Sequence, residues 1–231
     1  MQRIIQVGTD KILSLWDLRG MYFLAFEGLD GSGKSSLMVR LESELKNRRL
    51  DFIRTREPGG TSLGERLRDM ILEKSSCPPF PRAELLMYEA SRAQHVDELI
   101  QPALKSGKWV LTDRFSASSL AFQGAARGMG WEIVSQLNQF ATDGLSPHLN
   151  VLLDLSVEES RKRRGVRESQ LGVQADRIES ENEEFHQKVR EGFLKAASQK
   201  PEEWLVLEAS KSTEELYLIL MKELVRRKWL L

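Results

Sequence analysis

Residues 28–35 read Gly-Leu-Asp-Gly-Ser-Gly-Lys-Ser and come almost directly after the apolar run Tyr22–Phe26. A glycine, four further residues and then Gly-Lys-Ser, set between a strand and a helix, form the pattern of a phosphate-binding loop, or P-loop. The glycines permit backbone angles at which consecutive N–H groups point inward around phosphate oxygens. The helix expected from about Lys34 adds the positive end of its dipole. The sequence therefore predicts a nucleotide site between a strand and a helix.

The predicted ATP-binding residues are those of the loop itself and the residue after it. They are Gly28, Leu29, Asp30, Gly31, Ser32, Gly33, Lys34, Ser35 and Ser36. In this motif the lysine reaches the β- and γ-phosphates and the serine hydroxyl coordinates Mg²⁺, which assigns these roles to Lys34 and Ser35. A glycine-rich turn without a ligand is the alternative, and the strand-to-helix context argues against it.

Five short apolar runs alternate with longer amphipathic segments. The runs are nearly continuously apolar, as expected for parallel strands covered on both faces: Tyr22–Phe26, Phe52–Thr55, Trp109–Thr112, Asn150–Leu155 and Trp204–Glu208. Helices are expected after the P-loop and over Thr61–Leu72, Ala83–Leu104, Glu132–Ala141, Glu158–Arg164, Glu179–Ala197 and Thr213–Arg227. This alternation predicts one α/β domain, with a five-stranded parallel sheet flanked by helices.

Composition limits the classes of partner. The chain has 34 basic and 34 acidic residues, so a general attraction to nucleic acid or to a membrane surface is not expected. Cys77 is the only cysteine, which favours a reducing compartment and a cytoplasmic location. No run approaches the roughly 18 apolar residues of a membrane span. The three histidines lack the spacing of a structural zinc site.

The first twenty residues are apolar only in part, since Gly8-Thr9-Asp10-Lys11 interrupts them. An uninterrupted secretory segment is therefore missing. We expect residues 1–20 to be an extension outside the core and residues 21–231 to form the catalytic domain.

Four further motifs narrow the class of P-loop protein. They are Arg56-Glu57-Pro58-Gly59-Gly60-Thr61, Tyr88-Glu89-Ala90-Ser91-Arg92, the run from Asp113-Arg114-Phe115 to Phe122-Gln123-Gly124, and Asp176-Arg177-Ile178-Glu179. From about Met21 to the C-terminus the chain resembles the thymidylate kinases. That resemblance implies the nucleoside monophosphate kinase fold of the P-loop NTPases, and transfer of the γ-phosphate of ATP to dTMP in dTTP synthesis. It also implies Mg²⁺ and a homodimer.

The resemblance assigns the dTMP site to Glu57, Pro58, Arg68, Tyr88, Arg92, Arg114, Ser119, Phe122 and Gln123. Asp113 and Arg114 follow a predicted strand, so their side chains are expected at the carboxyl edge of the sheet, where ligands bind in this architecture. A guanidinium there can form paired hydrogen bonds to phosphate oxygens. The resemblance gives Arg114 that role and places Asp113 beside the magnesium.

Tyr88 and Arg92 lie four residues apart on a predicted helix and share one face. In the family the aromatic residue stacks on thymine and the arginine hydrogen-bonds the base. Phe122 stands where a tyrosine that excludes a ribose 2′-hydroxyl is frequent, which leaves the discrimination between deoxy and ribo substrates open. Arg68 is expected at the dTMP phosphate, with a solvated helix charge as the alternative.

The basic run 161–167 lies where this kinase class carries its lid, expected here over about residues 161–179. The P-loop contains no arginine, and the chain resembles the bacterial members that place catalytic arginines in the lid. The candidates are Arg161, Arg163, Arg164 and Arg167. Glu179 is expected either to reach a magnesium-bound water or to begin the following helix together with Asp176.

The predicted reaction is in-line transfer to a phosphate oxygen, in which positioning and charge neutralisation do most of the catalysis. The predicted catalytic residues are Asp30, Lys34, Arg114, Arg161, Arg164 and Arg167, and the metal ligands are Ser35, Asp113 and Glu179. Asp30 would orient the acceptor. Two alternatives remain open: a kinase that accepts dUMP or a broader set of deoxynucleotides, and a nucleotide-binding protein without turnover.

Overall fold

A computed structural model describes residues 20–172 and 174–230. Gly20 apart, the predicted extension over residues 1–20 lies outside the described residues, so its status stays a prediction. In the described part, no helix is long and apolar enough to cross a membrane.

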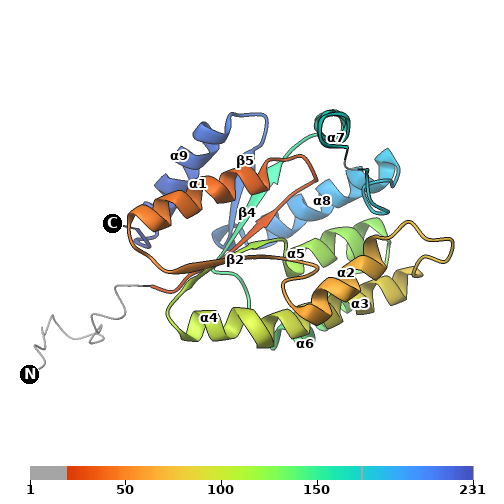
Figure 1. The fold of residues 1–231 in the computed structure, drawn as a ribbon, viewed down its shortest axis with the longest axis horizontal. Coiled ribbons are helices and arrows are strands. Elements are labelled where there is room, and N and C mark those ends of the chain that lie inside the picture. Colours follow the sequence, from red (N-terminus) through yellow and green to blue (C-terminus); the bar gives the residue numbers. More distant parts are fainter. Residues whose placement is uncertain (1–19, 173, 231) are drawn as a thin grey trace, which may run out of the picture.

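One parallel sheet carries the fold, with strand order β2-β3-β1-β4-β5 (Figure 1). The strands are β1 (Phe23–Glu27), β2 (Phe52–Arg56), β3 (Trp109–Asp113), β4 (Leu149–Asp154) and β5 (Trp204–Glu208). Each end lies within one residue of its sequence-based position. For β1, β3 and β4 the reason is that parallel strands buried on both faces are apolar along nearly their whole length. The predicted fold class is confirmed.

Helices cover both faces of the sheet (Figure 1). They are α1 (Lys34–Asn47), α2 (Ser62–Leu72), α3 (Pro81–His95), η1 (Val96–Ile100), α4 (Gln101–Lys105), α5 (Ser116–Ser119), η2 (Leu120–Ala126), α6 (Trp131–Thr142), α7 (Val157–Leu171), α8 (Glu183–Gln199), η3 (Pro201–Glu203) and α9 (Thr213–Arg226). The predicted helix Ala83–Leu104 is present as α3, η1 and α4 without a break in the chain.

Alternate side chains of β1 divide the core into two sides. Leu24 and Phe26 pack in one cluster with buried leucines of α1 and α9. Phe23 and Ala25 face the opposite way, toward η1 and α4. The central strand is therefore buried on both faces, which fixes the position of the P-loop that follows it.

Two predicted helix boundaries after β4 were wrong. The helix expected over Glu158–Arg164 continues to Leu171 as α7, whose C-terminal cap is Gly172 with φ 65°, a backbone angle that glycine adopts at little cost. The helix expected from Glu179 begins instead at Glu183, because the Asn182 side chain accepts from Phe185 N–H and caps it there. Glu179 thus lies in the turn before α8, and most of the predicted lid is α7 itself.

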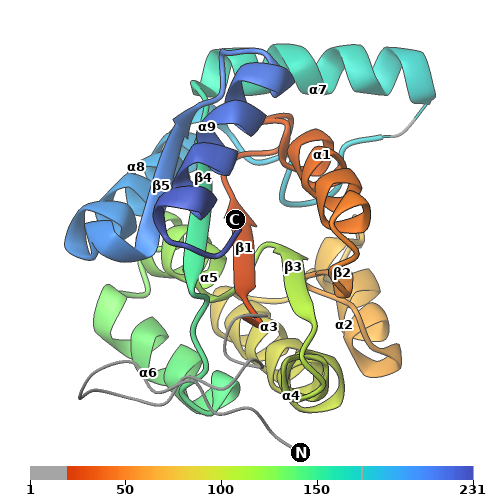
Figure 2. The ribbon, with the colours of Figure 1, turned by 90° about the vertical axis from the view of Figure 1, so that its left-hand side faces the viewer.

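Figure 2 shows α7 lying across the end of the sheet at which the strands finish. At that edge Glu27, Arg56 and Asp113 end three neighbouring strands, and the register pairs Arg56 with Asp113. A site at this edge can therefore draw charged side chains from several strands while α7 covers it.

Candidate active site

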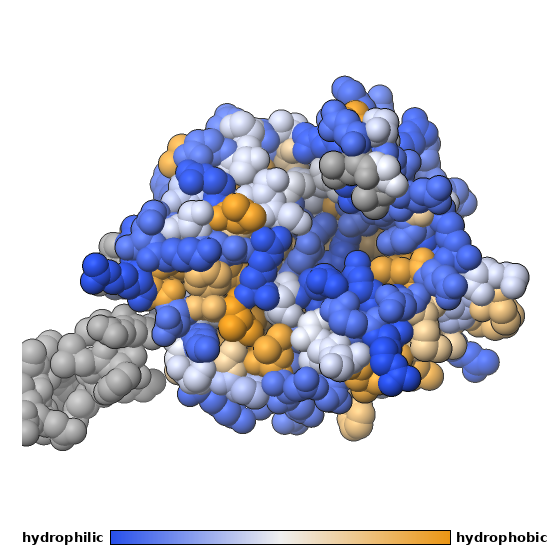
Figure 3. All heavy atoms as spheres, viewed as in Figure 1, coloured by the Kyte–Doolittle hydropathy of each residue, from blue (hydrophilic) through white to orange (hydrophobic). Residues whose placement is uncertain are grey.

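A cavity of about 510 Å³ opens at this edge of the sheet. Its wall comes from the P-loop, the end of β3, α2, α3, α5, η2, α7 and residues 176–179. On the face shown in Figure 3 the surface is hollowed between α7 and the helices α2 and α3, and hydrophilic residues surround the hollow.

Most of the predicted site residues line this cavity. They are Asp30, Gly31, Gly33, Lys34, Ser35, Ser36, Glu57, Pro58, Arg68, Tyr88, Arg92, Asp113, Arg114, Ser119, Phe122, Gln123, Arg167 and Glu179. Five predicted residues are not part of its wall: Gly28, Leu29, Ser32, Arg161 and Arg164. Segments separated by more than a hundred residues in sequence thus meet in one cavity.

Lys34 is buried at the first turn of α1, and its ammonium group lies among oxygen atoms. Its Nζ donates to the carbonyl oxygens of Gly28 and Leu29 at 3.2 and 3.3 Å. The carboxylates of Asp30 and Asp113 lie 3.8 and 3.9 Å away. Burial and the nearby Arg114 lower the pKa of Lys34. The three glycines of the loop that have positive φ angles allow the close turn around this group.

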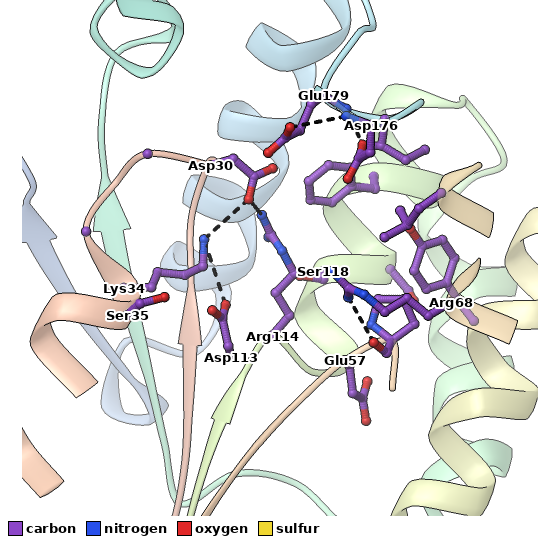
Figure 4. A pocket seen from close by; sticks show the side chains of 18 of the residues that line it. Asp30, Lys34, Ser35, Glu57, Arg68, Asp113, Arg114, Ser118, Asp176 and Glu179 are labelled. Atoms are coloured by element: carbon purple, nitrogen blue, oxygen red, sulfur yellow. Dashed lines mark hydrogen bonds and ion pairs between the residues drawn. The ribbon is translucent and has the colours of Figure 1, made fainter. Parts of the chain in front are cut away.

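Arg114 lies opposite Lys34, and Figure 4 shows both side chains pointing toward Asp30. Its Nη2 donates to Asp30 Oδ1 at 2.8 Å, and its Nη1 donates to Ser118 Oγ at 3.3 Å. The backbone of Arg114 has φ 73°, a left-handed conformation that residues other than glycine rarely adopt. Burial raises the pKa of Asp30, but Arg114 and Lys34 outweigh it, so that pKa is lowered.

Glu27 forms hydrogen bonds with the segment that follows the strained backbone of Arg114. It is completely buried and accepts hydrogen bonds from Phe115 N–H at 2.9 Å and Ser118 Oγ at 2.6 Å. Burial raises the pKa of Glu27 to about 7, although Arg114 and the two hydrogen bonds act in the opposite direction. The carboxyl group therefore holds the segment that positions Arg114.

Arg92 occupies the other end of the cavity and is 1% exposed. Its guanidinium donates to Glu57 at 2.8 Å, Glu89 at 2.8 Å, Ser119 at 2.9 Å and Asn138 at 2.7 Å. A further bond runs to the Phe115 carbonyl oxygen. Protein groups thus hold this arginine in one orientation, because a buried charge needs such partners.

Glu57 belongs to the motif over residues 56–61 and bonds both Arg92 and His95. Its other oxygen lies 2.9 Å from His95 Nδ1, and His95 Nε2 lies 2.7 Å from Thr55 Oγ1. Arg68 Nη1 donates to the Pro58 carbonyl oxygen at 3.0 Å. Arg68 is therefore turned toward this motif in the cavity, which disfavours the solvated alternative.

Tyr88, Phe122 and Gln123 form the remaining wall at this end together with the apolar side chains of Leu72 and Ile178. The guanidinium carbon of Arg114 lies 5.0 Å from the centre of the Phe122 ring. Burial raises the pKa of Tyr88, so its hydroxyl is neutral at ordinary pH. An aromatic and apolar wall beside buried polar groups suits a planar base with hydrogen-bonding edges.

The four lid arginines differ in where they point. Arg163 and Arg167 line the cavity. Arg161 is exposed and pairs with Glu183, whereas Arg164 is buried and donates to the Glu179 carbonyl oxygen. The structure thus singles out Arg163, which the predicted catalytic set omitted, together with Arg167.

The beginning of α7 lies against the P-loop. Ser160 Oγ donates to the Asp30 carbonyl oxygen at 2.7 Å. A Cβ atom on Gly31 would lie 3.3 Å from both Arg163 Cβ and the Ser160 carbonyl oxygen, and Gly31 has φ 79°. A side chain at this loop position would require its neighbours to shift by a few tenths of an ångström and would hold a strained backbone angle.

The predicted metal ligands offer hydroxyl and carboxylate oxygens. Ser35, Asp113 and Glu179 all line the cavity. Glu179 also pairs with Arg167 at 2.7 Å and accepts from Asp176 N–H at 3.3 Å. Within the described ranges no group of three or more His, Cys, Asp or Glu side chains could hold a metal ion together. The few oxygen donors of Ser35, Asp113 and Glu179 suit Mg²⁺, because this ion keeps several water molecules and takes substrate phosphates as further ligands.

Sequence reasoning missed three residues that hold the site side chains in place, as well as the apolar Leu72 and Ile178 of the cavity wall. Ser118 lies inside the motif 113–124, and its hydroxyl bonds both Arg114 and Glu27. Glu27 is a charged residue at the end of an apolar strand, which was a usable signal. Glu84 precedes Tyr88 by one helical turn and contacts Gln123 at 2.9 Å.

Comparisons with known proteins identify the family of the chain. The family model described as thymidylate kinase matches residues 26–217. A thymidylate kinase of Bdellovibrio bacteriovorus is 56% identical over 208 residues, covering 90% of this chain and 97% of that protein. One of Caldanaerobacter subterraneus is 42% identical over 200 residues, covering 87% and 93%.

A solved thymidylate kinase structure from Ehrlichia chaffeensis superposes with a TM-score of 0.70 at 28% identity, covering 89% of this chain and 99% of that one. The sequence and structural comparisons therefore name the same family. The chain belongs to the thymidylate kinase family, whose members phosphorylate dTMP to dTDP with ATP.

Proposed function

We propose that the charged end of the cavity holds the phosphates of ATP and dTMP, and that the end formed by Tyr88, Phe122 and Gln123 holds thymine. The position of Arg114 carries this proposal. Its guanidinium bonds Asp30 of the P-loop and lies over the ring of Phe122, so it stands between the two ends. A cation at that point contacts both the donor and the acceptor phosphate.

The reaction proposed here needs no general base. A phosphate oxygen of dTMP attacks the γ-phosphorus of ATP, a bond forms between them, and the bond from that phosphorus to the β–γ bridging oxygen breaks. Lys34 and Arg114 neutralise the charge that spreads over the phosphoryl oxygens, and Asp30 keeps Arg114 in place. Catalysis then rests on positioning and fixed charge.

Arg163 and Arg167 are proposed as the lid arginines that reach the transferring group. Both line the cavity, and each is held by a carboxylate, Glu159 in one case and Glu179 in the other. Arg161 and Arg164 have other partners and are assigned structural roles instead.

The proposed metal ligands are Ser35 and Asp113, with Glu179 acting through water. Bound there, Mg²⁺ would supply further neutralisation of phosphate charge. The exposed Ser35 hydroxyl is free to turn toward a ligand at the start of α1, and Asp113 is held in the cavity by Lys34.

A coupled ADP-release assay with ATP, Mg²⁺ and dTMP tests the proposed site, run beside dUMP, dCMP, dGMP and UMP. We expect strong preference for dTMP, lost in Lys34→Ala. Comparable rates with dUMP would favour the broader deoxynucleotide kinase. ATP binding without turnover of any monophosphate would leave a nucleotide-binding protein.

A homodimer is proposed from apolar side chains on three helices that pack together, α2, α3 and α6. The exposed residues there are Leu63, Met70, Leu86, Ile133 and Phe140. Phe140 is 86% exposed, which is unusual for so large an apolar side chain unless another surface covers it. Light scattering of the purified protein should give twice the chain mass, and Phe140→Glu should give the monomer mass.

A further inference from the structure

Glu84 of α3 is a buried carboxylate for which neither the proposed chemistry nor the metal site has a use. It is 1% exposed and does not line the cavity. Its Oε1 accepts from Gln123 Nε2 at 2.9 Å and from Arg127 Nε at 3.2 Å. Its Oε2 accepts from Arg127 Nη2 at 3.2 Å and Arg177 Nη2 at 2.6 Å.

These contacts keep Glu84 ionised. Burial raises the pKa of Glu84, but the hydrogen bonds from Gln123, Arg127 and Arg177 outweigh it, and the pKa is lowered. An ionised carboxylate only accepts hydrogen bonds. Whatever group faces Glu84 must therefore donate.

This restriction fixes the orientation of the Gln123 amide. The two ends of an amide side chain differ, because the nitrogen donates and the oxygen accepts. With the NH₂ group held on Glu84, Gln123 Oε1 points away from it. Among the described residues none donates a hydrogen bond to that oxygen, while Gln123 itself lines the cavity.

An acceptor that faces the cavity distinguishes pyrimidines by their N3 atom. In thymine and uracil N3 carries a hydrogen and donates, whereas in cytosine N3 is an acceptor. A cytosine placed at the same position would bring two acceptors together and leave both without a donor, which is costly in a buried site.

We propose that Glu84 is a positioning residue that sets base specificity: it holds Gln123 with the amide oxygen toward the cavity, so that the site selects a pyrimidine with a hydrogen on N3. This inference rests on the proposed placement of the base beside Gln123.

The same carboxylate also holds one wall of the base site. Arg177 donates to the Ile71 carbonyl oxygen at the end of α2 as well as to Glu84. Its neighbours Asp176 and Ile178 both line the cavity. Replacing Glu84 therefore affects stability too, and the test must separate that effect from specificity.

The decisive variant is Glu84→Gln, read out as the ratio of kcat/KM for dTMP to kcat/KM for dCMP. A glutamine at position 84 can donate as well as accept, so the Gln123 amide is free to turn its NH₂ group toward the cavity. We expect the ratio to fall at least tenfold, mainly through a higher KM for dTMP, with KM for ATP unchanged. Glu181→Gln is the matched control, because Glu181 pairs with Arg127 at 2.7 Å without contacting Gln123; it should leave the ratio unchanged.

Two more variants keep the test decisive. Gln123→Met removes both hydrogen-bonding groups and should lower the ratio by itself. Glu84→Asp keeps an acceptor-only carboxylate and should retain most of the dTMP-to-dCMP ratio that Gln123→Met loses. This comparison tests the role of Glu84 even if Glu84→Gln does not fold.

The outcomes separate the two proposals. A folded Glu84→Gln protein with the wild-type ratio, beside a Gln123→Met protein that has lost it, overturns the role of Glu84 and leaves the base site intact. An unchanged ratio in Gln123→Met overturns the placement of the base itself. A Glu84→Asp ratio as low as that of Gln123→Met also contradicts the inference.

Discussion

The two ends of the cavity are built from different parts of the fold. The phosphate end takes Asp30 and Lys34 from the loop after β1 and Asp113 from the end of β3, and all three charges face the cavity. At the base end, Arg92 lies on a helix and is bound on nearly every side by protein groups. The phosphate end presents charge to the cavity, whereas the charge of Arg92 at the base end is bound by protein groups and keeps that part of the wall in place.

This difference predicts what a substitution at each end will change. Removing a charge that faces the cavity should lower the rate and leave the fold nearly unaffected. Removing a charge that other side chains enclose should lower stability first, because its partners lose their counter-charge inside the protein.

The largest effect is expected for Lys34→Ala. Because Lys34 supplies fixed positive charge at the transferring phosphoryl group, kcat should fall about 1,000-fold or more. The free energy of unfolding should change little, since burying this ammonium group is unfavourable and lowers its pKa. Steady-state ADP release and urea unfolding measure the two quantities. A large loss of stability with near-normal kcat would contradict the comparison.

Arg92→Met should show the opposite pattern. The substitution keeps the stem of the side chain but leaves Glu57 and Glu89 without their counter-charge, at a cost of about 3 kcal/mol or more in the free energy of unfolding. Urea unfolding at neutral pH measures this cost. Arg40→Met is a control, because Arg40 pairs with Glu214 on the surface and its loss should cost less than about 1 kcal/mol.

Glu27 is buried against the segment after Arg114 and makes stability depend on pH. The folded-state pKa of about 7 exceeds the ordinary value of 4.5, so the fold binds this proton more tightly than the unfolded chain does. The stabilisation is complete below about pH 4.5 and is lost as the pH rises to about 7. Over that range wild-type protein should lose on the order of 3 kcal/mol relative to Glu27→Gln. Equal pH profiles in urea unfolding would show that Glu27 does not titrate in this range.

The arginines of α7 allow charges that face the cavity to be compared with a surface charge on the same helix. Arg163→Met and Arg167→Met should each lower kcat by about 10- to 100-fold, since each removes a charge that faces the cavity. Arg161→Met should leave kcat unchanged because its partner is Glu183 on the surface. Equal losses at positions 161 and 163 would mean that the run acts through its total charge.

Every residue predicted for the base end lines the cavity, whereas Gly28, Leu29 and Ser32 of the P-loop do not. Sequence patterns alone nevertheless account for the phosphate end more directly than for the base end. The P-loop and the strand ends are local features, and a glycine pattern or an apolar run reveals them without knowledge of distant contacts. The partners of Arg92 and the role of Glu84 depend on contacts between segments far apart in the chain, such as the 39-residue separation of Glu84 and Gln123. No periodicity in one helix contains that information.

The lid shows a second limit of prediction from the sequence. Its basic run was recognised, but the four arginines look equivalent in sequence, and only the direction of each side chain from α7 separates those that face the cavity from those that do not. The start of α8 was misplaced because Asp176 and Asn182 both precede acidic residues and are both good helix caps.

The contact between Gly31 and Arg163 has a consequence for how such kinases can change over time. A carbon added to Gly31 would lie 3.3 Å from Arg163 Cβ and from the Ser160 carbonyl oxygen, and any residue other than glycine at position 163 keeps that Cβ. A lineage that moved its catalytic arginine from α7 to the loop would therefore have to shift the start of α7 by a few tenths of an ångström. A new side chain at position 163 alone would not make that room, so related chains with a larger residue at position 31 should differ in the path of the backbone at the start of this helix.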